Sequence, residues 1–237
     1  MSAPEIKALY FDVFGTVVDW RASVAREAAA VLGGQGLDRD WHDFADRWRA
    51  RYQPAMEEVR SGRRPWVGLD DLHRENLVAL LAELGIEGLS EGEIDHLNRA
   101  WHRLDPWPDV VDGLTRLKRS YILATLSNGN VALMVNMAKR AGLPWDVILG
   151  AEVARAYKPQ PEAYLRAAAL LDLPPASCMM VAAHNGDLVA ASACGLRTAF
   201  VARPTEHGRA QDWDLRPERT FDLCADSFVD LAEQLGC

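Results

Sequence analysis

Short apolar runs that alternate with longer amphipathic segments are the feature that most narrows the fold. Apolar runs that indicate buried strands occur at 6–11, 121–126, 147–149, 179–181 and 198–201. Segments with a helical pattern lie between or after them, at 110–118, 131–141, 161–171, 188–194 and 228–235. Strands without polar alternation, joined by helices, are typical of a parallel sheet covered on both faces. The pattern therefore predicts an α/β, Rossmann-like core.

One long segment interrupts this alternation directly after the first strand. It spans residues 18–104 and is predicted to be almost entirely helical. Leucines recur on one helical face from Leu69 to Leu84, and Gly85 then supplies a helix end. The sequence therefore predicts a core built from residues 1–17 and 105–237, with residues 18–104 inserted as a helical cap.

Polar clusters follow several of the predicted strands. They are Asp12 to Thr16, Ser127-Asn128-Gly129, Lys158-Pro159 and His184-Asn185-Gly186-Asp187. Ligands of parallel α/β sheets bind beyond the carboxyl ends of the strands, so these clusters are the candidate site. Gly15 and Thr16 favour a tight loop whose backbone N–H groups face a ligand.

Each cluster also has an ordinary structural interpretation. Asp12 and Asp187 are residues that commonly cap helices or turns. Ser127-Asn128-Gly129 has the composition of a simple turn. Lys158 would be solvated in most proteins, and His184 would be a hydrogen-bonded core histidine. The combination, in this order on an α/β chain, is more specific than any one part.

Composition limits the classes of partner. The 237 residues are 49% apolar and 25% charged, which is ordinary for a globular protein. Lys and Arg number 26 against 34 Asp and Glu, a net charge of −8, which disfavours binding to nucleic acid. A small anionic substrate would need local basic residues to bind it.

Cysteine usage and hydropathy bear on location. Cys178, Cys194, Cys224 and Cys237 form no C-x-x-C pair, so free thiols and no zinc site are expected. No apolar run approaches the roughly 18 residues that span a membrane, and the first residues lack a signal-peptide layout. We therefore expect a cytoplasmic protein with no membrane partner.

The ordered set of clusters resembles the haloacid dehalogenase superfamily, most clearly in Tyr10-Phe11-Asp12-Val13-Phe14-Gly15-Thr16. The resemblance covers nearly the whole chain. Phosphatases of that superfamily carry a second aspartate two residues after the nucleophile, where this chain has Phe14, which cannot transfer a proton. They also carry a second acidic-loop carboxylate, where this chain has Ala191, so a Mg²⁺ site would be poor. The sequence is most similar to the metal-independent type II L-2-haloacid dehalogenases.

The resemblance assigns roles position by position. Asp12 matches the nucleophile, and Thr16 matches the threonine that orients it. Ser127 and Asn128 match the pair that holds the substrate carboxylate and the halide. Lys158 matches the lysine beside the nucleophile.

Further matches complete the implied site. Tyr164 matches a tyrosine behind the site, and Asp187 matches the carboxylate near the hydrolytic water. Val13 and Phe14 fall in the loop that contacts substrate and halide. In the cap, Trp48-Arg49 matches a Trp-Arg pair whose arginine contacts the halogen, with Arg47 and Arg51 as alternatives.

The acidic loop departs from the family pattern. It reads Ala182-Ala183-His184-Asn185-Gly186-Asp187, without the family's serines and with His184 in place of an asparagine. His184 is therefore a candidate to position or deprotonate water, against a structural role.

The resemblance implies hydrolysis of (S)-2-haloalkanoic acids to (R)-2-hydroxy acids through an aspartyl ester on Asp12. It implies no cofactor and no metal, a small anionic haloacid as the binding partner, and a homodimer. Two alternatives stay open, namely a Mg²⁺-dependent phosphatase of the same superfamily and a non-catalytic interaction protein that kept the fold.

Overall fold

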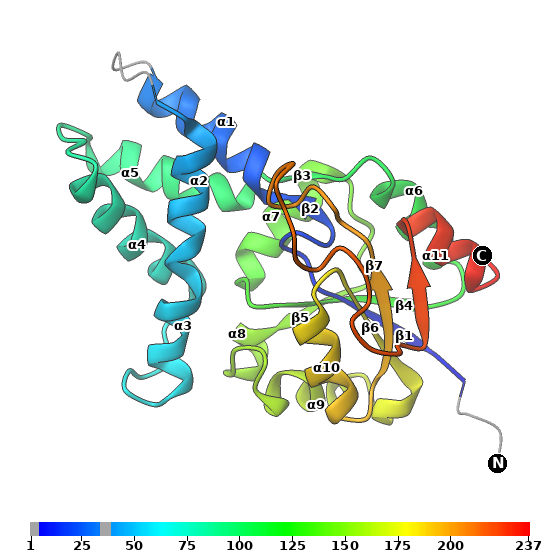
Figure 1. Ribbon diagram of the computed structural model, residues 1–237. Helices are drawn as coiled ribbons and strands as arrows, with labels where there is room; N and C mark the ends of the chain where they lie inside the picture. The colour runs from blue at the N-terminus through cyan, green and yellow to red at the C-terminus, as the bar shows by residue number, and fades with distance from the viewer. Residues whose placement is uncertain (1–4, 34–38) are drawn as a thin grey trace.

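The centre of the protein is a parallel sheet (Figure 1). The computed structural model describes residues 5–33 and 39–237. Within these residues, six strands pair in the order β5 (Val147–Gly150), β4 (Ile122–Ser127), β1 (Ala8–Phe11), β6 (Cys178–Ala182), β7 (Arg197–Val201) and β8 (Leu223–Ala225). Every neighbouring pair in this order is parallel. The predicted α/β class is confirmed.

The side chains of β1 show why the sheet is covered on both faces. All four residues of the strand are fully buried. Leu9 and Phe11 join one hydrophobic cluster, and Ala8 and Tyr10 join another. Successive side chains of a strand point to opposite faces, so an uninterrupted apolar run needs a helical layer on each side.

Helices supply those two layers. The cluster around Leu9 and Phe11 includes residues of α6 (Val110–Leu117), α7 (Val131–Ala141) and α11 (Phe228–Gln234). The cluster around Ala8 and Tyr10 includes residues of α9 (Pro161–Leu170) and α10 (Asn185–Ala193). Shorter elements connect them, namely α8 (Ala151–Ala154) and the 3₁₀ helix η3 (Pro175–Ser177).

Two sequence predictions in this core were wrong in detail. The strand at Arg197–Val201 is not the last one, because the three residues of β8 pair with it. Its three residues, Leu223 to Ala225, are apolar but form a run too short to predict a strand. The helix expected at 188–194 begins earlier, at Asn185, so Asp187 lies in its first turn rather than ahead of it.

The helices of residues 18–104 lie together beside the sheet (Figure 1). They are α1 (Trp20–Leu32), α2 (Trp41–Ala50), α3 (Tyr52–Arg60), α4 (Leu69–Glu83), α5 (Glu91–Asn98) and the 3₁₀ helix η2 (Arg99–His102). The predicted leucine face of α4 is buried, and Gly85 follows the helix with a φ of +65°. The chain enters and leaves this segment through a two-stranded antiparallel pair, β2 (Val18–Asp19) and β3 (Asp105–Pro106).

The helical segment shares its core with the sheet. One continuous cluster of buried residues contains Leu9 and Phe11 of β1 together with Trp20, Trp48 and Trp101 of the helical segment. The boundaries 1–17, 18–104 and 105–237 remain a prediction about domain organisation.

Two further observations bear on earlier expectations. In the part of the chain that the structure describes, no helix combines the length and the hydropathy needed to cross a bilayer. All four cysteines are free thiols, and Cys178 is buried.

A close contact between α6 and α11 gives a test of the packing. A Cβ added to Gly113 would lie 2.5 Å from the backbone carbon of Phe228. We expect Gly113→Ala to lower the free energy of unfolding by about 1–3 kcal/mol, because overpacking outweighs the helix propensity that alanine adds. Urea denaturation measures this change.

Gly92 is the matched control, because it is also helical but has nothing within 4 Å of its added Cβ. Gly92→Ala should leave the free energy of unfolding unchanged or raise it by up to about 1 kcal/mol. Equal effects of the two substitutions would show that α6 and α11 are not tightly packed.

Candidate active site

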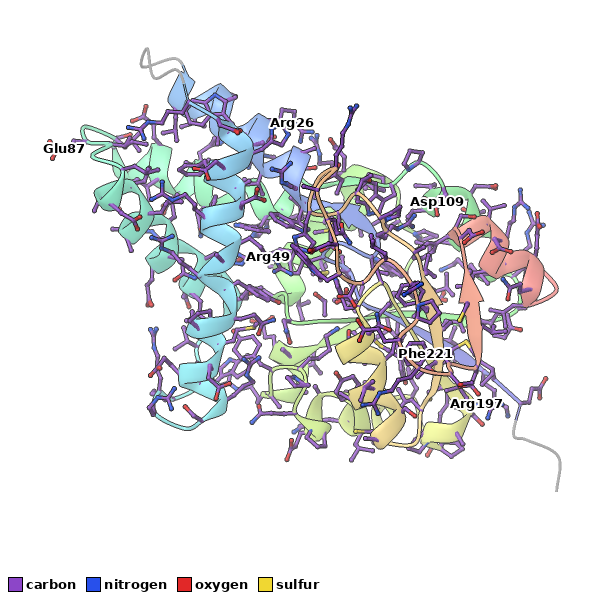
Figure 2. All side chains as sticks on the ribbon, in the orientation of Figure 1. Arg26, Arg49, Glu87, Asp109, Arg197 and Phe221 are labelled. Atoms are coloured by element: carbon purple, nitrogen blue, oxygen red, sulfur yellow. The ribbon has the colours of Figure 1, made fainter. Side chains whose placement is uncertain are left out.

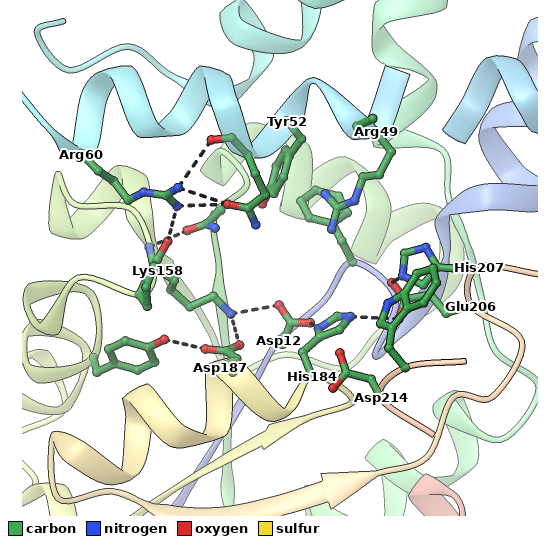
Figure 3. Close-up of a pocket in the computed structure, with 18 residues that line it drawn as sticks. Asp12, Arg49, Tyr52, Arg60, Lys158, His184, Asp187, Glu206, His207 and Asp214 are labelled. Atoms are coloured by element: carbon green, nitrogen blue, oxygen red, sulfur yellow. Dashed lines mark hydrogen bonds and ion pairs between the residues drawn. The ribbon is translucent and has the colours of Figure 1, made fainter. Parts of the chain in front are cut away.

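The polar clusters predicted at the strand ends meet at one cavity (Figure 3). Its volume is about 690 Å³. Asp12 follows β1, Asn128 follows β4, and His184 and Asp187 follow β6, while Lys158 comes from the segment after α8. The parallel arrangement brings these carboxyl ends to the same edge of the sheet. Residues of α2 and α3 face them across the cavity.

Asp12 is the most heavily coordinated side chain of the site. It is 7% exposed. Its Oδ1 accepts a hydrogen bond from Lys158 Nζ at 2.9 Å, and its Oδ2 accepts from Thr16 Oγ1 at 2.8 Å. His184 Nδ1 lies 3.1 Å from the same Oδ2. Burial acts to raise the pKa of Asp12, but Lys158 and His184 hold it well below its ordinary value. The carboxylate is therefore ionised and fixed in orientation.

Thr16 fixes the loop that carries Asp12. Its hydroxyl donates to Asp12 and accepts from the backbone N–H of Ala183 at 2.9 Å, so it joins the loops after β1 and β6. The Thr16 carbonyl accepts from Arg203 Nε at 2.9 Å. Arg203 in turn makes two 3.0 Å hydrogen bonds to Asp109, beside α11 (Figure 2).

Lys158 bridges the two carboxylates of the site. Besides Asp12, its Nζ contacts Asp187 Oδ2 at 2.5 Å. Burial alone would lower the pKa of Lys158, but Asp12 and Asp187 raise it above its ordinary value. The Lys158 backbone N–H donates to Asn128 Oδ1 at 2.8 Å, which fixes the lysine against the neighbouring strand end. Lys158 is buried, contrary to the solvated alternative.

Asp187 and Tyr164 form the rear of the site. Asp187 lies in the first turn of α10, and its Oδ1 accepts from the Tyr164 hydroxyl at 2.6 Å. Burial, followed by the charge of Asp187, raises the pKa of Tyr164 above its ordinary value, so the phenol keeps its proton and remains a donor. The capping alternative for Asp187 is wrong, because its oxygens are bound by side chains.

Other predicted site residues are divided between the cavity and the protein behind it. Phe14 and Asn128 line the cavity. Val13 and Ser127 are fully buried and do not line it. Ser127 Oγ accepts from the Gly129 backbone N–H at 3.1 Å, so its hydroxyl shapes the turn.

Among the three candidate arginines of α2 and its end, Arg49 faces the cavity. Its guanidinium carbon lies 4.0 Å from the ring centroid of Tyr52 and 5.5 Å from that of Trp20. Arg49 Nη1 is buried and has no hydrogen-bond partner among residues 5–33 and 39–237. Arg47 and Arg51 both pair with Glu83 instead. A half-buried cation with such a donor is suited to an anion.

Several residues of the cavity were not predicted from the sequence. They are Ala50, Tyr52, Gln53, Arg60, Glu206, His207, Trp213 and Asp214. Glu206 and His207 follow β7, so the strand-end rule that selected the other clusters would have selected them. Arg60 donates to the Lys158 carbonyl at 2.9 Å, a contact between the helical segment and the core that no local pattern reveals.

Comparisons with known proteins agree on one family. The family model for haloacid dehalogenase-like hydrolases matches residues 6–195. A solved defluorinating L-2-haloacid dehalogenase is 53% identical, with a TM-score of 0.96 over 98% of this chain and 96% of that one. A second solved L-2-haloacid dehalogenase is 49% identical, with a TM-score of 0.94 over 98% and 99%. The (S)-2-haloacid dehalogenase of Xanthobacter autotrophicus is 29% identical and aligns over 87% of this chain and 79% of its own length.

Removing the bridging cation tests the electrostatics of this site. We expect Lys158→Met to lower the free energy of unfolding by about 3–5 kcal/mol at pH 8, because two buried carboxylates lose their partner. The loss should be smaller at pH 5. Without Lys158 the pKa of Asp12 rises, so the folded variant takes up a proton as the pH falls and regains stability.

In the wild type the lowered pKa of Asp12 stabilises the fold fully above the unfolded value of about 4. Asp12 therefore contributes no such recovery to the wild type between pH 8 and pH 5. The raised pKa of His184 adds stability toward pH 5, so the test is the difference in the free energy of unfolding between wild type and variant at each pH. Lys139→Met, at an exposed position of α7, is the control and should change stability by less than about 0.5 kcal/mol. A Lys158→Met loss that is the same at both pH values would contradict the account.

Proposed function

Because this chain belongs to the haloacid dehalogenase-like hydrolases, we propose that it hydrolyses small (S)-2-haloalkanoic acids to (R)-2-hydroxy acids through an ester on Asp12. The relatives named as L-2- or (S)-2-haloacid dehalogenases support this substrate class. The observation that carries the proposal is the surrounding of Asp12. The Asp12 carboxylate is ionised, fixed in orientation and faces the cavity. Phe14, two residues later in the chain, lines the same cavity with an apolar ring.

The first half-reaction uses Asp12 as the nucleophile. One oxygen of its carboxylate attacks C2 of the substrate, the C–halogen bond breaks, and the halide leaves from the opposite side with inversion. Thr16 and Lys158 hold the carboxylate in place for this attack. No proton has to reach the leaving halide, so the absence of an acid at position 14 is no obstacle.

Cations and aromatic rings of the cavity suit the substrate. Arg49, which is half-buried, offers its buried Nη1 to the anionic end or to the departing halide, where a surrounding low in water strengthens the interaction. The rings of Phe14, Tyr52 and Trp20 pack around that guanidinium and shield part of it from water. Asn128 supplies a polar group on the opposite wall.

The second half-reaction breaks the ester. Water attacks the Asp12 carbonyl carbon, and the 2-hydroxy acid leaves with its own C2–O bond intact. Lys158 contacts the Asp12 carboxylate and also Asp187, so these two side chains offer polar partners to the incoming water. Asp12 then returns to its carboxylate form.

The side chains of the site do not fit a magnesium ion. The ammonium of Lys158 already lies between Asp12 and Asp187, where a divalent ion would have to bind both. The side chain of Phe14 offers no oxygen, and neither does that of the buried Ala191 of α10. Mg²⁺ prefers near-octahedral oxygen ligation, which these residues do not supply. We therefore propose a reaction without a metal or cofactor.

Halide release is the direct test. The protein should release chloride from (S)-2-chloropropionate and not from the (R) enantiomer, and EDTA should leave the rate unchanged. Hydrolysis of p-nitrophenyl phosphate that depends on Mg²⁺, with no chloride release, would instead indicate the phosphatase alternative. (S)-2-Fluoropropionate belongs in the same assay, because one relative is named a defluorinating enzyme.

Asp12→Asn tests the nucleophile. The substitution keeps the shape of the side chain but removes its negative charge, so chloride release should fall by at least about 10³-fold with the fold intact. In one turnover of the wild type in H₂¹⁸O, the label should enter Asp12 before the product. Label in the first 2-hydroxy acid formed, with an unlabelled Asp12 peptide, would indicate direct displacement by water.

Arg49 is tested against its neighbours. Arg49→Met should slow the alkylation step by about 10²–10³-fold, because a preorganised donor for developing negative charge is lost. Arg47→Met and Arg51→Met remove the same charge from sites paired with Glu83 and should leave alkylation nearly unchanged. Rapid-quench measurement of chloride release separates these variants, and a larger effect at Arg47 or Arg51 would contradict the role of Arg49.

The cytoplasmic location, the homodimer, and the absence of nucleic-acid and membrane partners stay predictions from the sequence. The small anionic haloacid is the partner for which the site gives support, through Arg49 and Lys158.

A further inference from the structure

Glu206 is a buried carboxylate that the mechanism above does not use. It is 1% exposed. Its Oε2 accepts from His184 Nε2 at 2.9 Å, and its Oε1 accepts from Trp20 Nε1 at 2.9 Å. Burying an ionised carboxylate is costly unless it is paired and hydrogen-bonded. The chain nevertheless places this charge directly behind His184 (Figure 3).

The backbone next to Asp12 leaves space for Glu206. Gly15 has a φ of +90°, and a Cβ built on it would lie 2.0 Å from Glu206 Oε1 and 2.6 Å from Oε2. Any side chain at position 15 would therefore displace the carboxylate. Trp20, Gly15 and His184 together hold Glu206 in one orientation.

The resulting line of groups runs from Glu206 through His184 to the nucleophile. Glu206 can only accept, so it fixes a proton on His184 Nε2 and aims Nδ1 at Asp12 Oδ2, 3.1 Å away. A carboxylate that orients a histidine against a reacting group is the arrangement of a general base and its positioning residue. His184 also lines the cavity, so water can reach it.

We propose that His184 is the general base of ester hydrolysis and that Glu206 is its positioning residue, an inference that rests on the dehalogenase function proposed above. The contact between His184 and Asp12 indicates in which half-reaction His184 acts. The halide leaves C2 on the side away from the attacking Asp12 oxygen, whereas His184 contacts that carboxylate itself. His184 is therefore placed for attack on the Asp12 carbonyl carbon rather than for departure of the halide.

The charge of Asp12 controls when His184 can act. In the free enzyme both ring nitrogens of His184 face carboxylates. Burial alone would lower the pKa of His184, but Glu206 and Asp12 raise it well above its ordinary value. Alkylation turns Asp12 into a neutral ester and removes one of those two charges. The Nδ1 proton is then released to solvent as the acid equivalent that accompanies the halide.

The second half-reaction then balances on these residues. As water adds to the Asp12 carbonyl carbon, Nδ1 takes one of its protons. When the intermediate collapses, the C–O bond to the 2-alkoxide breaks and that oxygen receives the proton from Nδ1. The remaining water proton, on the carboxylic acid of Asp12, moves to Nδ1 and restores the starting ion pair. The net change is haloacid plus water to hydroxy acid, halide and one proton.

A single-turnover experiment separates the two half-reactions. With enzyme in excess over (S)-2-chloropropionate, chloride release reports alkylation, and lactate formation reports hydrolysis. Glu206→Gln should leave the chloride phase nearly unchanged and slow lactate formation about 10–100-fold. His184→Gln should slow lactate formation by about 10²–10⁴-fold. Alkylated Asp12 should accumulate in both variants, as seen by peptide mass spectrometry after an acid quench.

Two comparisons make the result specific. Glu162→Gln, the same change at an exposed position of α9, should alter neither phase. The double variant Glu206→Gln with His184→Gln should be no slower than His184→Gln alone, because Glu206 acts through His184.

The outcomes distinguish the inference from the function on which it rests. If the wild type releases no halide, the dehalogenase function fails. If the wild type is active but His184→Gln accumulates no alkylated Asp12, the inference is overturned, whether or not Glu206→Gln folds. A Glu206→Gln variant that slows chloride release without accumulating ester would likewise overturn it and indicate a structural role.

Discussion

The ammonium of Lys158 is the interaction on which the rest of the site depends. It lies between Asp12 and Asp187, and all three side chains are almost fully withdrawn from water. Two carboxylates this close would repel one another, and one would take up a proton if no cation separated them. With Lys158 in place, Asp12 stays ionised, as the proposed attack on C2 requires. The same ammonium occupies the space that a divalent ion would need.

The topology of the sheet explains how residues so distant in sequence reach this lysine. β1, β4 and β6 are neighbours and run in the same direction, so the residues after each strand meet at one edge. The loop after β1 contributes Asp12, the proposed nucleophile, and the segment after β6 contributes His184 and, in the first turn of α10, Asp187. The helical segment adds Arg49 from the opposite side. The site is therefore shared between the rigid sheet edge and a helix that packs over it.

Much of this arrangement was predictable because it depends on short-range patterns. Continuous apolar runs predicted β1, β4, β6 and β7, and the polar residues after three of these strands were already the candidate site. Other features depend on contacts between distant segments. The burial of Glu206 follows from Gly15, Trp20 and His184 together, and no window of sequence contains all four. β8 escaped detection because its pairing with β7, rather than its composition, makes it a strand.

The antiparallel pair β2–β3 has a consequence for how the chain can fold and diverge. Val18 pairs with Pro106 and Asp19 with Asp105, so the two ends of the helical segment are held side by side. The pair closes the inserted segment into a loop with adjacent ends. The entropy lost in joining β1 to β4 therefore grows only slowly with the length of that segment. Insertions of different size could be exchanged at this junction while the strand order is kept. The shared tryptophan-rich core sets the limit, because a new segment must still cover Phe14, which packs edge-on against Tyr52 and Trp101.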